Sequence, residues 1–274
     1  MLLVAALDED FCRKPRTGMW DFVLSKYLKP HSVDITRSFF VGDAAGRPAG
    51  WKRGRRGDHA STDRKFALNI GLKFLTPEEF FLGEPEVAYL SEDFDPKKTI
   101  AGAISIDEVV VSPSAHDQQE VVIFVGSPAS GKTTFYERHF MSLNYAHINQ
   151  DTLKTQPKCK AALIAAIESG RSAVVDNTNP SAAARKNILE ILLSRKIPAR
   201  CFWFQAEPKL TRHLNIHRSL TRKTYRLPEV AFAAYESRFQ EPQLSEGFSE
   251  VVKIPFKPRF DTKEDEAIFT MHLL

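Results

Sequence analysis

The stretch VVIFVGSPASGKTTF, residues 121–135, indicates the fold class. Its first five residues, Val121–Val125, are apolar and mostly β-branched, which predicts a buried strand, and a helix is expected from Thr133. Between them stands the pattern GxxxxGK followed by Thr, which begins at Gly126. Such a loop wraps around phosphate groups, because its glycines let backbone N–H groups point at phosphate oxygens. The sequence therefore predicts a site for a nucleoside triphosphate.

The residues of this loop have expected roles in that site. Lys132 reaches the β- and γ-phosphates, and Thr133 holds Mg²⁺ through its hydroxyl group. The positive end of the helix dipole adds to the attraction for phosphate. The residues expected to bind the nucleotide are Gly126, Ser127, Ala129, Ser130, Gly131, Lys132, Thr133 and Thr134. ATP and Mg²⁺ are the predicted cofactors.

Strand-like and helix-like segments alternate after the loop. Strands are expected at residues 145–148, 172–175 and 200–204, and helices at residues 159–169 and 184–196. Asn179 is expected to be the N-cap that begins the second of these helices, with Pro180 in the first helical position. Such alternation implies βαβ crossovers and a parallel sheet, so this part is predicted to be an α/β domain.

Two carboxylates follow strands of the predicted sheet. Asp151 lies 19 residues beyond Lys132, just past the second strand, and Asp176 ends the third. Because the carboxyl ends of parallel strands meet at one crevice, Asp151 can take the proton from an attacking hydroxyl, with a helix N-cap as the alternative role. Asp176 is expected to act as a Walker-B-like aspartate or to bind the substrate, with a structural role as the alternative. No NKxD sequence is present, which disfavours a GTPase.

The positive charge of the chain is concentrated towards its C-terminal end. From His116 onward 22 Lys and Arg stand against 17 Asp and Glu, and the segment from Pro208 to Arg226 has no acidic residue. Its cations are Lys209, Arg212, Arg218, Arg222, Lys223 and Arg226. We expect this segment to be a lid that neutralises charge on the transferring phosphoryl group and grips an anionic substrate.

The N-terminal part also alternates between strand-like and helix-like segments. Strands are expected at Leu2–Ala6 and Ser38–Val41, and helices at Gly18–Leu28 and Asp63–Leu68. About 93 residues can hold only part of a doubly wound sheet, so this domain is expected to be incomplete. The predicted organisation is a partial domain at residues 1–93, a linker at 94–119 and the loop-containing domain at 120–274.

Several protein classes are excluded by composition. No apolar run approaches the roughly 20 residues of a membrane-spanning helix, and the apolar residues 2–7 lack the basic flank of a signal peptide. The cysteines Cys12, Cys159 and Cys201 form no CxxC pair, which disfavours a disulfide framework and a zinc site. The sequence predicts a soluble, intracellular protein.

A short basic loop interrupts the N-terminal part. Lys52, Arg53, Arg55 and Arg56 could contact a DNA backbone or act as a nuclear signal, and a solvated loop is the alternative.

Three stretches, GSPASGKTTF, HINQDTL and VVDNTNPS, resemble the kinase domain of the polynucleotide kinase 3′-phosphatase family. The N-terminal stretches FVGDAAGR and DRKFALNIGLKFLTPEEFF resemble its phosphatase domain, which has a haloacid-dehalogenase (HAD) fold. The resemblance implies a P-loop kinase domain preceded by a partial HAD-like domain. It also implies that Asp151 activates a 5′-hydroxyl and that Arg218 is the catalytic lid arginine. Asp176, Arg212 and Arg222 are expected to contact nucleic acid, with an internal helix pair as the alternative role of Arg212.

One departure from the family concerns the phosphatase. Lys14 matches the lysine of the family and Asp43 its metal-binding aspartate, but no DxDGT motif supplies a nucleophile: Asp8 and Asp10 have no Gly-Thr after them. Without a nucleophile no phosphoaspartyl intermediate can form. The 3′-phosphatase activity is therefore expected to be lost.

The resemblance implies ATP-dependent phosphorylation of 5′-hydroxyl ends of DNA or RNA during strand-break processing. It implies a monomer that has DNA ends and repair proteins as partners, acts away from membranes and is located in the nucleus, with the cytoplasm and mitochondria as other locations. Two alternatives are a P-loop kinase of a small metabolite and a non-catalytic protein that binds DNA ends. A basic lid disfavours the first, and intact Lys132, Thr133 and Asp151 disfavour the second.

Overall fold

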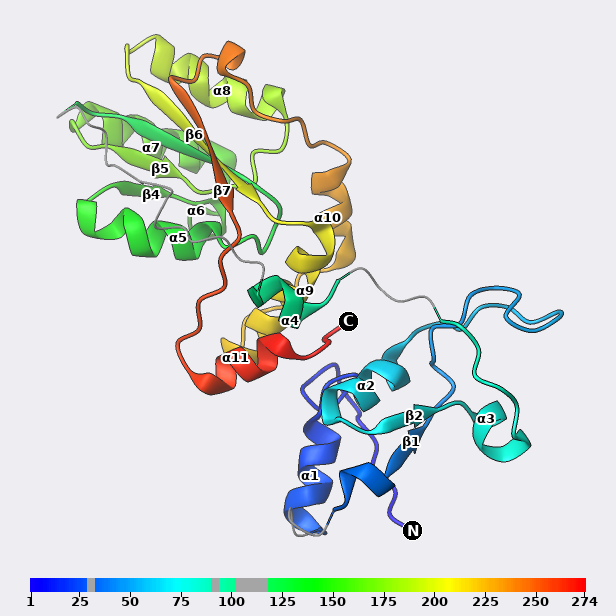
Figure 1. Ribbon diagram of the computed structural model, residues 1–274. Coiled ribbons are helices and arrows are strands. Elements are labelled where there is room, and N and C mark those ends of the chain that lie inside the picture. Colours follow the sequence, from blue (N-terminus) through cyan, green and yellow to red (C-terminus); the bar gives the residue numbers. More distant parts are fainter. Residues whose placement is uncertain (29–32, 90–93, 102–117) are drawn as a thin grey trace. The chain divides into compact units, whose positions relative to one another are not determined.

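The computed structural model describes residues 1–28, 33–89, 94–101 and 118–274 (Figure 1). These residues form two compact units. The first contains residues 1–101, 216–225 and 259–274, and the second contains the described residues of 118–215 and 226–258. The long helix α9 (Pro208–Thr221) is divided between them.

This division differs from the predicted domain boundaries in two ways. Residues 216–225 and 259–274 join the first unit, although the sequence assigned both to the kinase domain. Helix α4 (Pro96–Ala101) lies inside the predicted linker 94–119, and residues 102–117 of that linker lie outside the described residues.

The second unit is built on a five-stranded sheet in which every neighbouring pair is parallel, as the alternation of elements predicted. The strand order is β4-β5-β3-β6-β7. The strands are β3 (Val121–Val125), β4 (Ala146–Ile148), β5 (Ala173–Val175), β6 (Ala199–Gln205) and β7 (Glu250–Pro255). β7 was not predicted. β5 lies between β3 and β4, so the second strand of the domain is not a neighbour of the first.

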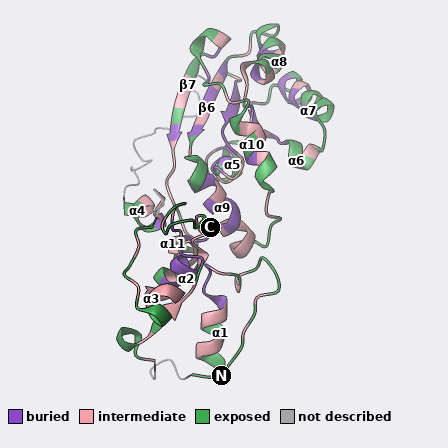
Figure 2. Ribbon diagram, turned by 90° about the vertical axis from the view of Figure 1, so that its right-hand side faces the viewer, coloured by how far each residue is buried: buried purple, intermediate pink, exposed green. Residues whose placement is uncertain are grey.

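Helices cover both faces of this sheet because β3 is apolar on both sides (Figure 2). Val121, Ile123 and Val125 pack in one cluster with α7 (Gln156–Glu168) and α8 (Ala182–Leu193). Val122 and Phe124 point to the other face and pack with α5 (Lys132–His139). All five residues of β3 are fully buried, which is typical of a central parallel strand.

The predicted start of α8 was wrong. The N-cap is Ser181, whose hydroxyl accepts a hydrogen bond from the Ala184 N–H at 3.2 Å. The Asn179 side chain instead donates to the carbonyl of Phe124 at 2.7 Å and so ties the loop after β5 to the end of β3.

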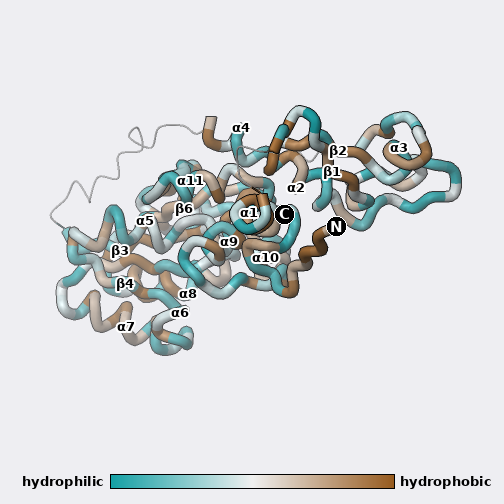
Figure 3. Tube along the Cα trace, turned by 90° about the horizontal axis from the view of Figure 1, so that it is seen from below, coloured by the Kyte–Doolittle hydropathy of each residue, from teal (hydrophilic) through white to brown (hydrophobic). Residues whose placement is uncertain are grey.

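The first unit contains one pair of parallel strands, β1 (Phe39–Val41) and β2 (Lys73–Leu75), among its described residues. Its helices include α1 (Gly18–Lys26), α2 (Thr62–Ile70), α3 (Pro77–Leu82), α4, α11 (Lys263–Thr270) and the C-terminal part of α9. The predicted strand Leu2–Ala6 was wrong. These residues form no strand and are largely exposed, although Figure 3 colours the N-terminal segment as hydrophobic.

The C-terminal segment joins the first unit through hydrogen bonds to α2. Asn69 donates to the carbonyl of His272 at 2.9 Å and accepts from its N–H at 2.8 Å. Lys65 donates to the Leu274 carbonyl at 2.6 Å. None of these pairs has a signature in sequence spacing, since more than 200 residues separate the partners. Across the described ranges, no helix combines the length and the apolar character needed to cross a membrane.

Candidate active site

The phosphate-binding loop connects β3 directly to α5, as predicted. Gly126 follows the strand, and a Cβ atom at this position would lie 2.9 Å from the Phe204 Cβ and from the Ser130 Oγ. No larger residue fits there without moving β6 or the loop. Gly131, with φ 91°, is the N-cap of α5, so the N–H groups of the first helical turn face the loop.

Lys132 is almost completely buried beneath this loop. Its ammonium group donates hydrogen bonds to the carbonyls of Gly126 at 3.0 Å and Ser127 at 2.7 Å. The charge is therefore held against the inner side of the loop. Ser127 also lies next to α9, with its hydroxyl 3.5 Å from that of Thr211.

Asp176 receives hydrogen bonds from three directions at the end of β5. The Thr133 hydroxyl donates to its Oδ2 atom at 2.7 Å, and the Asn149 amide donates to the same atom at 3.0 Å. The His147 Nε2 atom lies 2.9 Å from that oxygen, and its ring stacks on Tyr136 with the ring centroids 3.9 Å apart. Asp176 thus joins β5 to the phosphate-binding loop and to β4.

These contacts keep Asp176 ionised although it is only 2% exposed. Burial alone raises the pKa of the carboxyl. The hydrogen bonds from His147, Thr133 and Asn149, with the charge of Lys132, outweigh burial and hold the pKa of Asp176 below its ordinary value. A buried carboxylate beside a threonine hydroxyl is a donor set that suits Mg²⁺.

Asp151 lies exposed in the first turn of the short helix α6 (Gln150–Leu153). The helix is capped by Asn149, whose side-chain oxygen accepts from the N–H groups of Asp151 at 2.8 Å and Thr152 at 3.3 Å. The alternative role of Asp151 as the N-cap was therefore wrong. Among the described residues, no side chain forms a hydrogen bond or an ion pair with the Asp151 carboxylate.

Asn149 connects the two candidate carboxylates. Its oxygen caps the helix that carries Asp151, while its amide nitrogen donates to the backbone carbonyl and the Oδ2 atom of Asp176, both at 3.0 Å. Asn177 supports the same turn, since its side chain accepts from the Gln150 N–H at 2.9 Å. The strand order places the residues after β4, β5 and β3 in a row along one edge of the sheet.

The basic segment is not free of acidic neighbours. Arg212 forms ion pairs with Glu229 and Glu236 of α10 (Glu229–Glu236), and the Nη1–Oε1 distance to Glu236 is 2.7 Å. The hydrogen bonds that Arg212 donates to Glu236 and Glu229 raise the pKa of Arg212. Within the first unit, His217 lies 3.0 Å from the Asp265 carboxylate. These ion pairs fit the alternative role of Arg212 as an internal helix pair, because they tie α9 to α10. The predicted nucleic-acid contact at Arg212 stays a prediction.

Arg218 and Arg222 belong to the first unit, whereas the phosphate-binding loop belongs to the second. Their predicted roles at the phosphoryl group and at the nucleic acid stay predictions. Arg222 is exposed.

The predicted phosphatase residues Lys14 and Asp43 lie in the first unit. The Lys14 ammonium forms an ion pair with Asp63, a buried carboxylate that sequence reasoning missed. Asp63 also accepts a hydrogen bond from the Ala44 N–H at 3.1 Å, while Asp43 itself is exposed. Within the described ranges, no three His, Cys, Asp or Glu residues gather closely enough to hold a metal ion.

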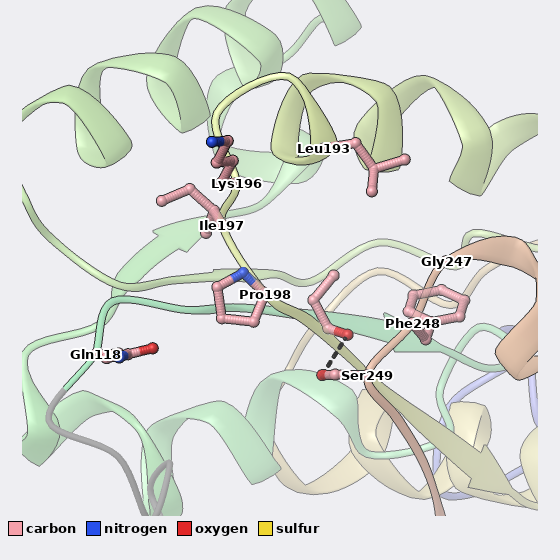
Figure 4. A pocket seen from close by; sticks show the side chains of 9 residues that line it. Gln118, Leu193, Lys196, Ile197, Pro198, Gly247, Phe248 and Ser249 are labelled. Carbon is pink, nitrogen blue, oxygen red and sulfur yellow. Dashed lines mark hydrogen bonds between the residues drawn. The ribbon is translucent and has the colours of Figure 1, made fainter.

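A shallow cavity in the second unit lies at the other end of the sheet (Figure 4). It is lined by residues that precede strands, among them Gln118 before β3, Pro198 before β6 and Phe248 before β7. Ser249 donates to the Ala199 carbonyl at 3.0 Å in its wall. Because the phosphate-binding loop follows the carboxyl end of β3, this cavity is separate from the candidate active site.

Comparison with known proteins finds one matching family model for each half of the sequence. The family model described as polynucleotide kinase 3 phosphatase matches residues 1–81, and the model described as AAA domain matches residues 121–242. The bifunctional polynucleotide phosphatase/kinase of Schizosaccharomyces pombe is 43% identical over 257 residues, which are 94% of this chain and 60% of that protein. Over nearly its whole length, the chain is therefore similar in sequence to a bifunctional polynucleotide phosphatase/kinase.

A second relative, from Acanthamoeba polyphaga mimivirus, is 32% identical over 266 residues, which are 90% of this chain and 63% of that protein. The chain thus spans about three fifths of the length of these two polynucleotide phosphatase/kinase relatives. Among solved structures, Kti12 of Chaetomium thermophilum in complex with ADP-AlF3 is 17% identical, with a TM-score of 0.39 over 54% of this chain and 95% of that chain.

Sequence reasoning missed several residues of the candidate active site. His147 and Asn149 both contact Asp176, and Asn149 caps α6. An asparagine between a strand and a helix is a common N-cap signal, so the capping role of Asn149 was detectable. Its bond to Asp176 was not, since the pairing of β4 with β5 had to be known first.

Proposed function

We propose that this chain transfers the γ-phosphoryl group of ATP to the 5′-hydroxyl end of a nucleic acid. The observation that carries the proposal is the chain of contacts from Thr133 through Asp176 and Asn149 to the first turn of α6, where Asp151 is exposed. This arrangement links a nucleotide site to a carboxylate that can meet an acceptor. Homology to a bifunctional polynucleotide phosphatase/kinase supports a nucleic-acid end as that acceptor.

In the proposed reaction the phosphate-binding loop receives the triphosphate. Backbone N–H groups at the start of α5 donate hydrogen bonds to its oxygens, and Lys132 offsets the charge of the β- and γ-phosphates. Thr133 and Asp176 would together hold Mg²⁺, and their oxygens lie 2.7 Å apart. When bound, the metal ion supplies positive charge next to the transferring phosphoryl group.

Asp151 is the proposed general base. An exposed carboxylate in this turn can accept the proton of a 5′-hydroxyl as its oxygen attacks the γ-phosphorus atom. Asn149 fixes the turn through the cap of α6, so it acts as a positioning residue. Lys154, which donates to the Asp151 carbonyl at 2.6 Å, holds the end of the same turn.

The basic segment supports an anionic acceptor. We assign Arg218 to charge neutralisation at the phosphoryl group and Arg222 to the nucleic-acid backbone. The acceptor class includes both DNA and RNA ends, and DNA repair proteins are the proposed partners of a monomeric enzyme. A nuclear location is proposed on the resemblance alone.

The decisive experiment offers 5′-hydroxyl oligonucleotides and small sugar acceptors to the purified chain with labelled ATP. We expect transfer to the oligonucleotides only. Asp151→Asn should reduce transfer about 10²- to 10⁴-fold, the usual contribution of a positioned base, while ATP binding stays unchanged. Lys132→Ala should weaken both ATP binding and turnover.

The substitution Glu137→Gln at an exposed position of α5 is a matched control, because it removes one carboxylate from the same unit without touching the site. Transfer to a sugar in place of the oligonucleotide would identify a metabolite kinase. Near wild-type transfer by folded Asp151→Asn would remove Asp151 from the mechanism.

A further inference from the structure

The loop between β1 and α2 carries an uninterrupted positive charge. Residues 48–57 contain Lys52, Arg53, Arg55 and Arg56 and no acidic residue, and the segment from Lys52 to Arg56 is exposed throughout. Figure 1 shows this part of the chain projecting from the body of the first unit. The catalytic proposal does not use these residues.

The base of the loop is closed by a buried arginine. Arg47 is 5% exposed and binds Asp58 through two hydrogen bonds, from Nε at 2.8 Å and from Nη2 at 3.0 Å. It also donates to Glu78 of α3 at 2.8 Å. The Asp58 N–H donates to the Arg47 carbonyl at 3.0 Å, so side chains and backbone join the same two residues.

The interior of the loop is also bonded. The Arg47 guanidinium stacks on the Trp51 ring, with its Cζ atom 3.8 Å from the ring centroid. The Trp51 Nε1 atom donates a hydrogen bond to the Arg56 carbonyl at 3.2 Å. The Gly50 N–H donates to the Arg55 carbonyl at 3.1 Å. Gly50 and Gly54, with φ of 81° and 75°, supply the left-handed residues that its turns need. The cations are therefore held on a folded loop.

Three of the four cations at the tip are not neutralised by neighbours. Lys52 pairs with Glu84 at 2.6 Å. In the part of the chain that the structure describes, Arg53, Arg55 and Arg56 form no ion pair. Three guanidinium groups within four residues repel one another, and their mutual repulsion is relieved when a polyanion approaches.

We propose that this loop binds the sugar–phosphate backbone of the nucleic acid whose end the chain phosphorylates. The identity of the ligand rests on the proposed function. Guanidinium groups bind phosphate oxygens in a bidentate manner, and a backbone offers one phosphate per nucleotide to successive arginines. A receptor that reads a basic nuclear signal is a different partner. The closed loop favours the backbone, because its hydrogen bonds from Trp51 and Gly50 prevent an extended peptide from forming.

The test measures binding of a fluorescent 5′-hydroxyl oligonucleotide by anisotropy over a series of salt concentrations. The variant is Arg53→Gln/Arg55→Gln/Arg56→Gln in the full chain. Each phosphate contact contributes about 0.7 for a single strand and about 0.9 for a duplex to the slope of log K against log salt. We therefore expect the slope to become shallower by about 2 to 3, and the KM for the oligonucleotide to rise while kcat stays unchanged.

The matched control is Lys26→Gln/Lys73→Gln/Lys97→Gln, which removes three exposed charges from the same unit. Its salt slope should equal that of the unmodified chain. Trp51→Ala provides a second variant, since it loosens the loop and keeps its charges. That variant should bind more weakly at every salt concentration with an unchanged slope.

If the slope of log K against log salt is unchanged in the triple arginine variant, the inference is wrong. This holds also if the variant only loses nuclear accumulation, because the loop would then act as a nuclear signal. An equal change in the lysine control would also overturn it, because the effect would then be one of net charge. The proposed function fails separately. Binding through the loop without any phosphoryl transfer would refute the kinase and leave the loop as a nucleic-acid contact.

Discussion

Asp176 connects three parts of the candidate site at the scale of single residues. It is buried, yet hydrogen bonds from Thr133, Asn149 and His147 keep its pKa depressed. A carboxyl group with a depressed pKa in the folded state stabilises the fold above the pKa of the unfolded chain. That stabilisation is lost as the pH falls through the folded-state pKa. The charged form of Asp176 thus contributes to the stability of the fold.

We predict that Asp176→Asn makes stability less dependent on pH in the acid range. Between pH 7 and pH 3 the urea midpoint of the wild type should fall further than that of the variant. Below about pH 4 the unfolded wild-type chain binds a proton at Asp176 more readily than the folded chain does, and the variant has no such group. The measurement is a series of urea unfolding curves. Asp151→Asn, at an exposed position, is the control for the loss of one carboxylate. Parallel pH profiles for wild type and Asp176→Asn would contradict the prediction.

At the scale of helices, the basic segment connects α9 to α10. Arg212 fixes α10 to α9 through Glu229 and Glu236, and its guanidinium lies 5.2 Å from the Phe232 ring centroid. We predict that Arg212→Gln lowers the free energy of unfolding by about 1 kcal/mol and leaves the salt slope of oligonucleotide binding unchanged. Arg222→Gln, at an exposed position, should alter stability by less than about 0.5 kcal/mol and reduce the slope by about 1. The reverse pattern would identify Arg212 as the nucleic-acid contact and contradict this prediction.

The predictable elements are those with a local signal. The five apolar residues of β3 and the glycine pattern after them determined the strand, loop and helix. The edge strand β7 escaped prediction because Glu250–Pro255 mixes exposed and buried residues and ends in proline. Asn179 imitates an N-cap, but its amide bonds to Phe124, which lies 55 residues earlier. Contacts between distant elements decide such cases.

At the scale of the whole molecule, sequence predicted a parallel α/β kinase half and a second, partial half, and the structure confirms the parallel sheet. The division of the chain was not predictable. Asn69 and Lys65 of α2 bind the last three residues, and only the folded structure brings these segments together. The Lys14–Asp63 pair was likewise hidden, since its partners lie 49 residues apart without a shared motif.

We predict that this chain modifies the 5′ end of a DNA break and leaves the 3′ end unchanged. On a nicked duplex with a 3′-phosphate and a 5′-hydroxyl, the chain with Mg²⁺ and ATP should phosphorylate the 5′ end and leave the 3′-phosphate in place. The second unit contains the phosphate-binding loop, Asp176 and an accessible Asp151, which the proposed phosphoryl transfer uses. The first unit holds Asp43 and a lysine paired with Asp63, but neither supplies the nucleophile that phosphoryl transfer to the enzyme requires.

The assay follows both ends of the same labelled substrate by denaturing electrophoresis. Asp43→Asn should leave both ends as the unmodified chain does, whereas Lys132→Ala should abolish labelling of the 5′ end. Metal-dependent loss of the 3′-phosphate that disappears in Asp43→Asn would give the opposite answer. It would mean that Asp8 or Asp10, both exposed in the N-terminal segment, attacks phosphorus without a following Gly-Thr. The first unit would then be a working phosphatase, because one of these carboxylates would form the phosphoaspartyl intermediate.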